Sequence, residues 1–365
     1  MKLTSIEAAR GIAAIMVVFY HAANHMQRNI GYLPLGGIAQ FGHAGVDFFF
    51  VLSGFIIYYV HSKDVNNPSR LINYIERRFA RVYPLYWFVI VLALVLDLIF
   101  AKSIKSNFWT IAGSFTLYPT LFDPYIGVAW TLQHEIIFYS VFAIAIANGR
   151  LGFVIFFAWL VAILMSWCLG YTNHHNALTN KMLSFYSLEF FFGIFAAWVT
   201  LKTQTIPNVP SSESGGGRMK NKSKNLSLML GVLIFLMFGI SENIGMYDIN
   251  SIYARLGYGL SSMMIVVGLA GMGEMNKTKI SKALSILGSA SYSIYLTHLI
   301  FIGILYKILE LSGLFLSFYV WFTYLLLSLS GILGGVIISR LIEHSLTDLT
   351  RVYISRVKLL VKNVL

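Results

Sequence analysis

The sequence predicts an all-α polytopic integral membrane protein with about ten transmembrane helices. Three observations lead to this fold class: 57% of the 365 residues are hydrophobic, only 12% are charged, and the mean hydropathy is +0.72. A soluble globular domain carries about 25% charged residues, so the composition excludes a water-soluble enzyme. The single cysteine, Cys168, excludes a disulfide framework and a multi-cysteine metal site.

Ten apolar runs are long enough to cross a hydrocarbon core, which takes about 20 helical residues. They are 7–25, 44–60, 83–101, 129–147, 151–171, 182–201, 226–243, 252–273, 284–309 and 314–342. The stretch 108–122 is short and contains Gly, Pro and hydroxyl side chains, which favours a re-entrant or interfacial segment on the outer side. Residues 202–225 contain SSESGGG and then alternating Lys and Asn, which is typical of a flexible linker.

The basic residues predict the orientation of these spans. If the N-terminus is inside and 108–122 does not cross, most of the 27 basic residues fall in inner loops, as the positive-inside rule requires. The exceptions, outside or at outer span ends, are Arg28, Lys102, Lys105, Lys181, Arg255 and Lys307. We therefore expect both termini and the linker in the cytoplasm. Topology explains the basic excess, and nucleic acid is not an expected partner.

The first span carries two polar residues, Arg10 and His21. They interrupt the apolar core of a possible signal peptide after Lys2, and no small-residue cleavage site follows, so we expect a retained span. An 11-residue separation is close to three helical turns and roughly 16 Å of rise, so both share one face at opposite depths. Alternatively, Arg10 anchors the helix at the inner headgroups and His21 caps its outer end.

Ionisable side chains inside spans are costly in lipid and are candidates for function. His43 and Asp47 are four residues apart, which places them on one helical face near the outer surface. Asp47 suits either an ion pair with a neighbouring helix or a catalytic role. The fourth span begins with Trp130, His134 and Glu135 in its outer half.

Two later spans carry further ionisable residues. Glu189 has few polar neighbours in sequence, so we expect a structural role. His298 follows a strip of hydroxyl side chains near mid-membrane, where a single His is more often a hydrogen-bonded packing residue than a catalyst. Because His21, Asp47, Glu135 and His298 come from four spans and lie at outer and middle depths, we expect them to converge.

The segment RRFARVYPLYW places arginines at the cytoplasmic end of the third span. Arg77, Arg78 and Arg81 lie three or four residues apart, so a helix presents them side by side. Arginine forks suit phosphate oxygens. An ordinary positive-inside cluster beside an aromatic belt would look the same.

Five blocks of the chain resemble the acyltransferase-3 family of membrane acyltransferases, and within it bacterial exopolysaccharide acetyltransferases. They are SIEAARGIAAIMVVFYHA, GHAGVDFFFVLSGFII, RRFARVYPLYW, WTLQHEIIFY and SYSIYLTHLI, in the family's order from residue 5 to about 300. The resemblance implies one membrane domain over 1–365, with ten spans and cytoplasmic termini and without an appended soluble domain. It also implies a bacterial inner-membrane location, an acyl-CoA donor from inside and O-acylation of a carbohydrate at the outer face.

The resemblance also assigns positions. The family's Arg-x10-His pair, its Arg-x-x-Arg, the acidic residue of its Trp-Thr-Leu block and its late-span His fall on Arg10 and His21, Arg78 and Arg81, Glu135, and His298. The chain departs from the family at His134, where a Tyr or similar residue is common.

The expected mechanism follows from these positions. Arg78, Arg81 and Arg77 would hold the phosphates of coenzyme A, and Arg10 would guide the pantetheine arm or the same phosphates. His21 would be the general base on the sugar hydroxyl, since a His with pKa about 6.5 is mostly neutral at pH 7.

Further residues would support these roles. Glu135 or Asp47 would fix the tautomer of that base. His298, Trp130 and Tyr292 would bind the acceptor or the thioester carbonyl. Direct transfer is the simpler route, and an acyl-enzyme on His or Ser stays open.

Several alternatives stay open at this stage. The same buried charges could serve a secondary transporter as a proton relay, although no repeated half-architecture is evident. The chain could also be a structural subunit of a polysaccharide assembly complex. The acyl group could be acetyl or succinyl, and the glycan could be an exopolysaccharide or lipopolysaccharide, lipid-linked or polymeric. We expect membrane lipid as a partner and no metal, and the sequence does not indicate an oligomeric state.

Overall fold

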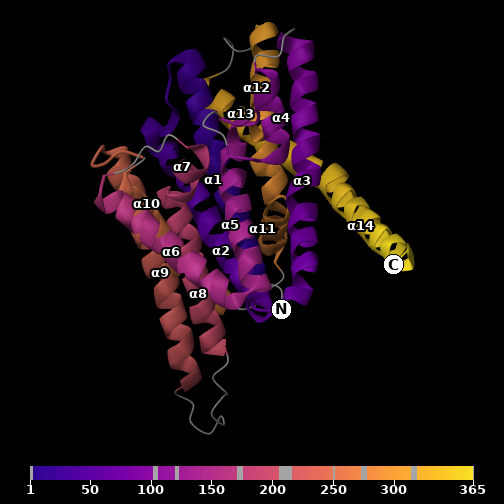
Figure 1. The fold of residues 1–365 in the computed structure, drawn as a ribbon. Coiled ribbons are helices and arrows are strands. Elements are labelled where there is room, and N and C mark those ends of the chain that lie inside the picture. The colour runs from indigo at the N-terminus through magenta and orange to yellow at the C-terminus, as the bar shows by residue number, and fades with distance from the viewer. Residues whose placement is uncertain are drawn as a thin grey trace. The chain divides into compact units, whose positions relative to one another are not determined.

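The computed structural model describes residues 3–101, 106–119, 123–170, 176–204, 216–249, 251–272, 278–313 and 319–364. All regular structure within these ranges is helical, and ten helices there are long and apolar enough to cross a membrane (Figure 1). Each of the ten overlaps one of the predicted runs, so their number is confirmed. The cytoplasmic location of the termini stays a prediction.

Most of the chain forms long α-helices joined by short helical turns. The longer helices are α1 (Thr4–Ile30), α2 (Gly45–His61), α3 (Leu71–Leu96), α5 (Trp130–Ala147), α6 (Gly149–Cys168), α8 (Phe185–Gln204), α9 (Gly216–Asn243), α10 (Ile252–Gly271), α12 (Ser291–Leu311), α13 (Val320–Ile338) and α14 (His344–Val364). The shorter elements are η1 (Pro34–Ala44), η2 (Ser62–Asp64), η3 (Pro68–Arg70), η4 (Asp97–Ala101), α4 (Phe108–Thr116), η5 (Gly127–Ala129), α7 (Ala177–Met182), α11 (Lys279–Ser289) and η7 (Ser339–Glu343).

Local sequence explains where several helices begin and end. The α1 helix stops at Gly31, which has a φ of 75° that favours glycine. The Asn107 side chain accepts the Thr110 N–H at 2.8 Å and so begins α4. Thr278 and Ser281 form a capping box at the start of α11.

The structure corrects three predicted boundaries. The predicted ninth span, 284–309, is broken at Ala290, so 284–289 belongs to α11 and the span itself is α12. Residues 216–225 belong to α9, so that part of the predicted linker is helical, while 205–215 lies outside the described residues. The α3 helix begins at Leu71 and therefore contains the arginine segment. The nine-residue α4 is too short to span, as predicted for this stretch.

The contacts of the chain divide it into two units, each of which we describe by itself. Unit 1 is Met1–Lys63, Leu183–Ser291 and Leu305–Leu329. Glycines bring its helices close together: a Cβ at Gly54 would lie 2.2 Å from the Phe190 carbonyl oxygen, and one at Gly193 would lie 2.0 Å from that of Val51. Helices α2 and α8 therefore pack backbone against backbone, as small residues allow in lipid.

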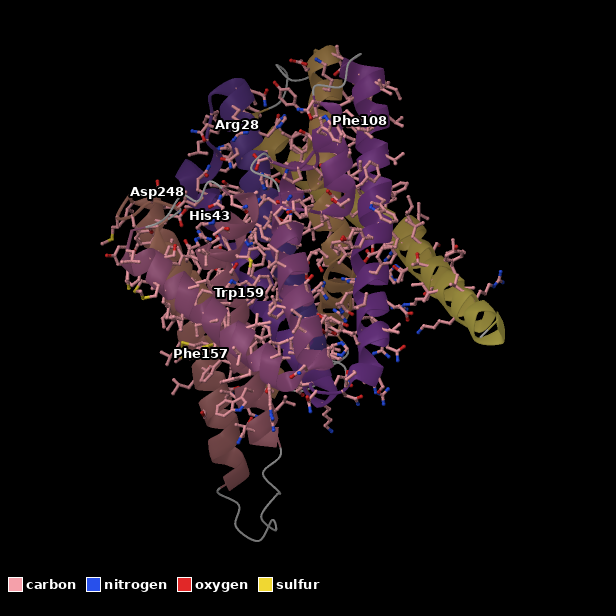
Figure 2. The ribbon with its side chains drawn as sticks, in the orientation of Figure 1. Arg28, His43, Phe108, Phe157, Trp159 and Asp248 are labelled. Carbon is pink, nitrogen blue, oxygen red and sulfur yellow. The ribbon has the colours of Figure 1, made fainter. Side chains whose placement is uncertain are left out.

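Unit 2 is Asp64–Met182, Tyr292–Ile304 and Ser330–Leu365. Its helices also meet at glycines, since a Cβ at Gly335 of α13 would lie 2.4 Å from the Ile294 Cα of α12. Aromatic side chains cover its outside: Phe108 and Phe157 are largely exposed, whereas Trp159 on the same helix as Phe157 is buried (Figure 2). An exposed apolar face of this kind is expected where a helix meets lipid.

Candidate functional site

The predicted site residues are distributed over both units. Unit 1 holds Arg10, His21 and Asp47. Unit 2 holds Arg77, Arg78, Arg81, Trp130, Glu135, Tyr292 and His298. The convergence of His21 and Asp47 with Glu135 and His298 stays a prediction, and the contacts inside each unit are as follows.

In unit 1, Arg10 and His21 lie on the single uninterrupted helix α1, as predicted. Both side chains are partly buried. Helix α11 lies against α1 next to Arg10, because a Cβ at Gly288 would be 2.0 Å from the Glu7 carbonyl oxygen and one at Gly11 would be 2.9 Å from the Gly288 nitrogen. The α11 backbone therefore contacts the α1 backbone on both sides of Arg10 in sequence.

The glycine before His43 in the GHAGVD motif brings this histidine close to α1, the helix that carries His21. A Cβ at Gly42 would lie 2.3 Å from the Met16 carbonyl oxygen, so the motif rests directly on the α1 backbone. As a result, the Tyr20 ring has edge contacts with both His21, at 4.9 Å between centroids, and His43, at 5.7 Å. The two imidazoles therefore share one aromatic neighbour.

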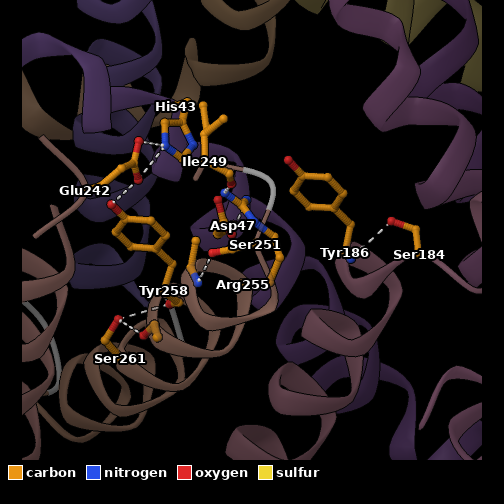
Figure 3. A network of polar contacts seen from close by, with 12 residues as sticks. His43, Asp47, Ser184, Tyr186, Glu242, Ile249, Ser251, Arg255, Tyr258 and Ser261 are labelled. Carbon is orange, nitrogen blue, oxygen red and sulfur yellow. Dashed lines mark hydrogen bonds and ion pairs between the residues drawn. The ribbon is translucent and has the colours of Figure 1, made fainter. Parts of the chain in front are cut away.

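His43 belongs to a buried chain of polar groups shown in Figure 3. Its Nε2 lies 2.8 Å from Oε1 of Glu242, near the end of α9. The Tyr258 hydroxyl of α10 donates to Oε2 of the same carboxylate at 2.7 Å. A carboxylate in this position fixes the orientation and tautomer of the imidazole.

Asp47 pairs with a neighbouring helix, which was one of the two roles foreseen for it. Arg255 of α10 donates from Nη1 to Oδ1 of Asp47 at 2.5 Å and from Nη2 to the Ile249 carbonyl at 2.7 Å (Figure 3). Its guanidinium lies 4.7 Å from the Tyr186 ring centroid. Asp47 is fully buried and Arg255 is 3% exposed.

His43 and Asp47 lie on two consecutive helices of different pitch, and their common face stays a prediction. η1 is a tighter 3₁₀ helix that ends at Ala44 and contains His43, whereas α2 begins at Gly45 and contains Asp47. Glu189, predicted to be structural, is fully buried close to Asp47 and Arg255.

In unit 2, the three predicted arginines of α3 are not equivalent. Arg77 is exposed, while Arg78 and Arg81 are partly buried. Arg81 donates from Nη1 to Oε1 of Glu343 at 3.0 Å and lies over the Tyr292 ring at 5.3 Å. The structure therefore brings Arg81 and Tyr292 together but leaves Arg77 apart from them.

Glu343 organises the surroundings of Arg81. It ends η7, a π-helical turn, and its Oε2 accepts hydrogen bonds from Ser293 at 2.7 Å and Ser339 at 2.8 Å. Such π-bulges occur often at functional sites. With three donors on one buried carboxylate, Glu343 is a well-satisfied anion rather than a free base.

Arg78 lies between two tyrosine rings, at 5.9 Å from Tyr74 and 5.6 Å from Tyr139. Its Nε has no hydrogen-bond partner among the residues that the structure describes. Tyr139 in turn donates its hydroxyl hydrogen to Glu135, so the predicted acid Glu135 lies close to the Arg78 environment within this unit. Arg78 can thus offer donors to an anion while aromatic rings hold its guanidinium.

The remaining predicted residues of unit 2 have mainly local partners. The fully buried His298 donates from Nδ1 to the Ile294 carbonyl at 3.1 Å, in its own helix, as expected for a packing histidine. Trp130 contacts the His134 ring and the Lys181 ammonium, which lies 5.6 Å from the Trp130 centroid. Burial lowers the pKa of Lys181, and Asp123 opposes that shift.

Sequence reasoning missed Glu242 and Glu343 and did not assign Arg255 to Asp47. The available signal was weak: each acidic residue stands at the end of a long apolar run, where a carboxylate is costly without a partner. Within the described ranges, no three His, Cys, Asp or Glu side chains are grouped closely enough to hold a metal ion.

Comparisons with known proteins place this chain in a family. The model of the acyltransferase-3 family, described as an acyltransferase domain, matches residues 3–342. The exopolysaccharide production protein ExoZ of Rhizobium meliloti (strain 1021) is 26% identical over 322 residues, which cover 84% of this chain and 89% of that protein. No solved structure matches. Because the family model spans nearly the whole chain, the protein belongs to the acyltransferase-3 family of acyltransferases.

Proposed function

We propose that the protein is a membrane O-acyltransferase that moves an acetyl group from cytoplasmic acetyl-CoA to a sugar hydroxyl of an exopolysaccharide at the outer face of a bacterial inner membrane. Family membership supports acyl transfer, and the name of the relative in Rhizobium meliloti supports an exopolysaccharide acceptor. Ten helices of spanning length support the membrane location.

The observation that carries the proposal is the state of Arg78. A partly buried guanidinium that lies over two tyrosine rings and forms no ion pair with a described carboxylate is suited to a phosphate group of coenzyme A. Arg81 is already ion-paired with Glu343, so only its remaining N–H groups would be available to bind a phosphate. Arg10 is the proposed guide for the pantetheine arm. Arg77, being exposed, is the weakest of the predicted phosphate ligands.

The proposed chemical step is direct transfer with His21 as general base. The imidazole takes the proton of the sugar hydroxyl while the oxygen attacks the thioester carbonyl carbon. The carbon–sulfur bond then breaks, and the thiolate of coenzyme A leaves and takes up the proton from the imidazolium. General-base catalysis of this kind contributes about 10² to 10⁴-fold.

The experiment uses the full chain in lipid nanodiscs with labelled acetyl-CoA and deacetylated exopolysaccharide. Losing a charged hydrogen bond costs about 1.5–3 kcal/mol, so Arg78→Gln should raise the KM for acetyl-CoA about 10 to 100-fold with little change in kcat. The matched control is Arg70→Gln, an exposed arginine just before the same helix. An unchanged KM in Arg78→Gln would exclude the phosphate contact.

The base is tested in the same assay. His21→Gln should lower kcat at least 100-fold with an unchanged KM for acetyl-CoA. The control is His25→Gln, one turn further along α1, where the imidazole packs edge-on against Tyr306. Transfer by His21→Gln at the wild-type rate would remove the base assignment. In sealed proteoliposomes, passage of glycan across the membrane without formation of labelled ester would favour a transporter.

A further inference from the structure

Unit 1 contains an apolar groove that the proposed reaction does not use. It has a volume of about 700 Å³ and lies between α1, the η1–α2 segment, α9, α10 and the start of α11. Ser5 is the only side chain in its lining with a hydrogen-bonding group, and its hydroxyl already donates to the Leu269 carbonyl at 2.9 Å. The groove therefore offers nothing to a sugar or a nucleotide.

The groove opens at the surface of the unit. Its lining residues Ile12, Leu236 and Met272 are 48%, 44% and 51% exposed. All three lie on or next to helices of membrane-spanning length, so this opening faces the surrounding bilayer. The buried Ala8 also lines the groove, and its small side chain leaves volume for a bound molecule.

One end of the groove is basic. Lys224 precedes the lining residue Leu228 by one turn of α9 and so lies on the same face. Its side-chain stem covers Gly271, where a Cβ would lie 2.1 Å from the Lys224 Cδ, directly beside the lining residue Met272. No carboxylate in the described part of the chain forms an ion pair with Lys224.

Two further lysines lie on α11, one of the helices that line the groove. Lys279 and Lys282 are exposed in the first turn of α11, whose Leu284 lines the groove. Glu7, on the first turn of α1, is the acidic residue on the neighbouring helix. Among the described residues, the cations on these helices therefore outnumber the acidic side chain, which suits an anionic headgroup.

We propose that this groove binds one anionic phospholipid, with an acyl chain along the apolar lining and the phosphate at Lys224. An apolar slot open to the bilayer accepts a hydrocarbon chain, and basic pockets between membrane helices bind anionic headgroups. Each lysine near such a headgroup contributes about fivefold in affinity. The site is independent of the proposed acyl transfer.

The test is native mass spectrometry of the full chain in detergent, titrated with phosphatidylglycerol and, separately, with phosphatidylcholine of the same chains. We expect one phosphatidylglycerol to bind at least fivefold more tightly than phosphatidylcholine. Lys224→Gln should lose about fivefold in affinity for phosphatidylglycerol only. The matched control is Lys63→Gln, an exposed lysine of the same unit after α2, which should bind both lipids like the wild type.

A second pair of variants tests the chain site. Ala9→Phe fills the groove and should abolish tight binding of both lipids, whereas Leu233→Phe, on the exposed side of α9, should not. If Ala9→Phe does not fold, Val232→Trp fills the groove from α9. Equal affinity of the wild type for the two lipids, or unchanged binding after Lys224→Gln and groove filling, would overturn the proposal.

Discussion

The buried ion pair between Asp47 and Arg255 makes a quantitative prediction about stability. Asp47→Asn keeps the shape of the side chain but removes the charge that faces Arg255 at 2.5 Å. Removing one partner of a buried pair typically costs about 3–5 kcal/mol, because the other charge stays buried. Glu189 lies beside Asp47 and can partly replace it, so we expect a loss at the lower end, about 3 kcal/mol.

The assay is equilibrium unfolding in mixed micelles of dodecyl maltoside with increasing SDS, followed by tryptophan fluorescence. Arg255→Met should cost a similar amount. The double variant should lose at least about 1 kcal/mol less than both single losses together, because it leaves no unpaired charge. Glu189→Gln is the matched control: one guanidinium needs one carboxylate, so its effect should be well below that of Asp47→Asn. Losses that add within about 0.5 kcal/mol would refute the pairing.

Two further predictions concern packing and pH. Gly54→Ala should lower the free energy of unfolding by about 1–3 kcal/mol, because its Cβ would lie 2.2 Å from the Phe190 carbonyl oxygen. The control Gly303→Ala, whose Cβ would have no neighbouring atom within 4 Å, should be neutral or stabilising. The same unfolding assay measures both variants. Burial lowers the pKa of Lys181 below its ordinary 10.5, so the unfolded state binds more protons between the two values and stability should rise with pH up to about 10.5. Lys181→Met should lose this part of the pH dependence, and an identical pH profile would contradict the shift.

Most of the helical architecture follows from the sequence, because hydropathy over about 20 residues is a local property. Boundaries were less predictable. The apolar run 284–309 has its one charged residue, Lys307, near its far end and none near residue 290, yet the helix breaks at Ala290 between α11 and α12. Conversely, the apolar run of the third span starts only at residue 83, although α3 already begins at Leu71 and includes the arginine segment. Hydropathy predicts the apolar part of a helix, and it does not predict how far the helix continues into polar sequence.

The candidate site was predictable in part. Motif spacing placed Arg10 and His21 on one helix, and the structure agrees. It did not find that Glu242 pairs with His43, 199 positions away, or that Glu343 pairs with Arg81, 262 positions away. Periodicity states which face of a helix is polar. The identity of the distant helix that covers this face depends on how the whole chain packs, which no local pattern contains.

The arginines of α3 show how a distant partner determines which side chain is available to a ligand. By spacing alone, Arg78 and Arg81 are equal candidates for a phosphate. Glu343 distinguishes them, because it is a buried carboxylate that accepts from Arg81 and from two serines. Removing Arg81 from this pair would leave a buried charge without its counter-ion, which is energetically costly. Arg78 lies over two tyrosine rings, which stabilise a cation without neutralising it, and no carboxylate in the described part of the chain forms an ion pair with it. A phosphate can therefore bind Arg78 without breaking an existing ion pair, whereas at Arg81 it would compete with Glu343.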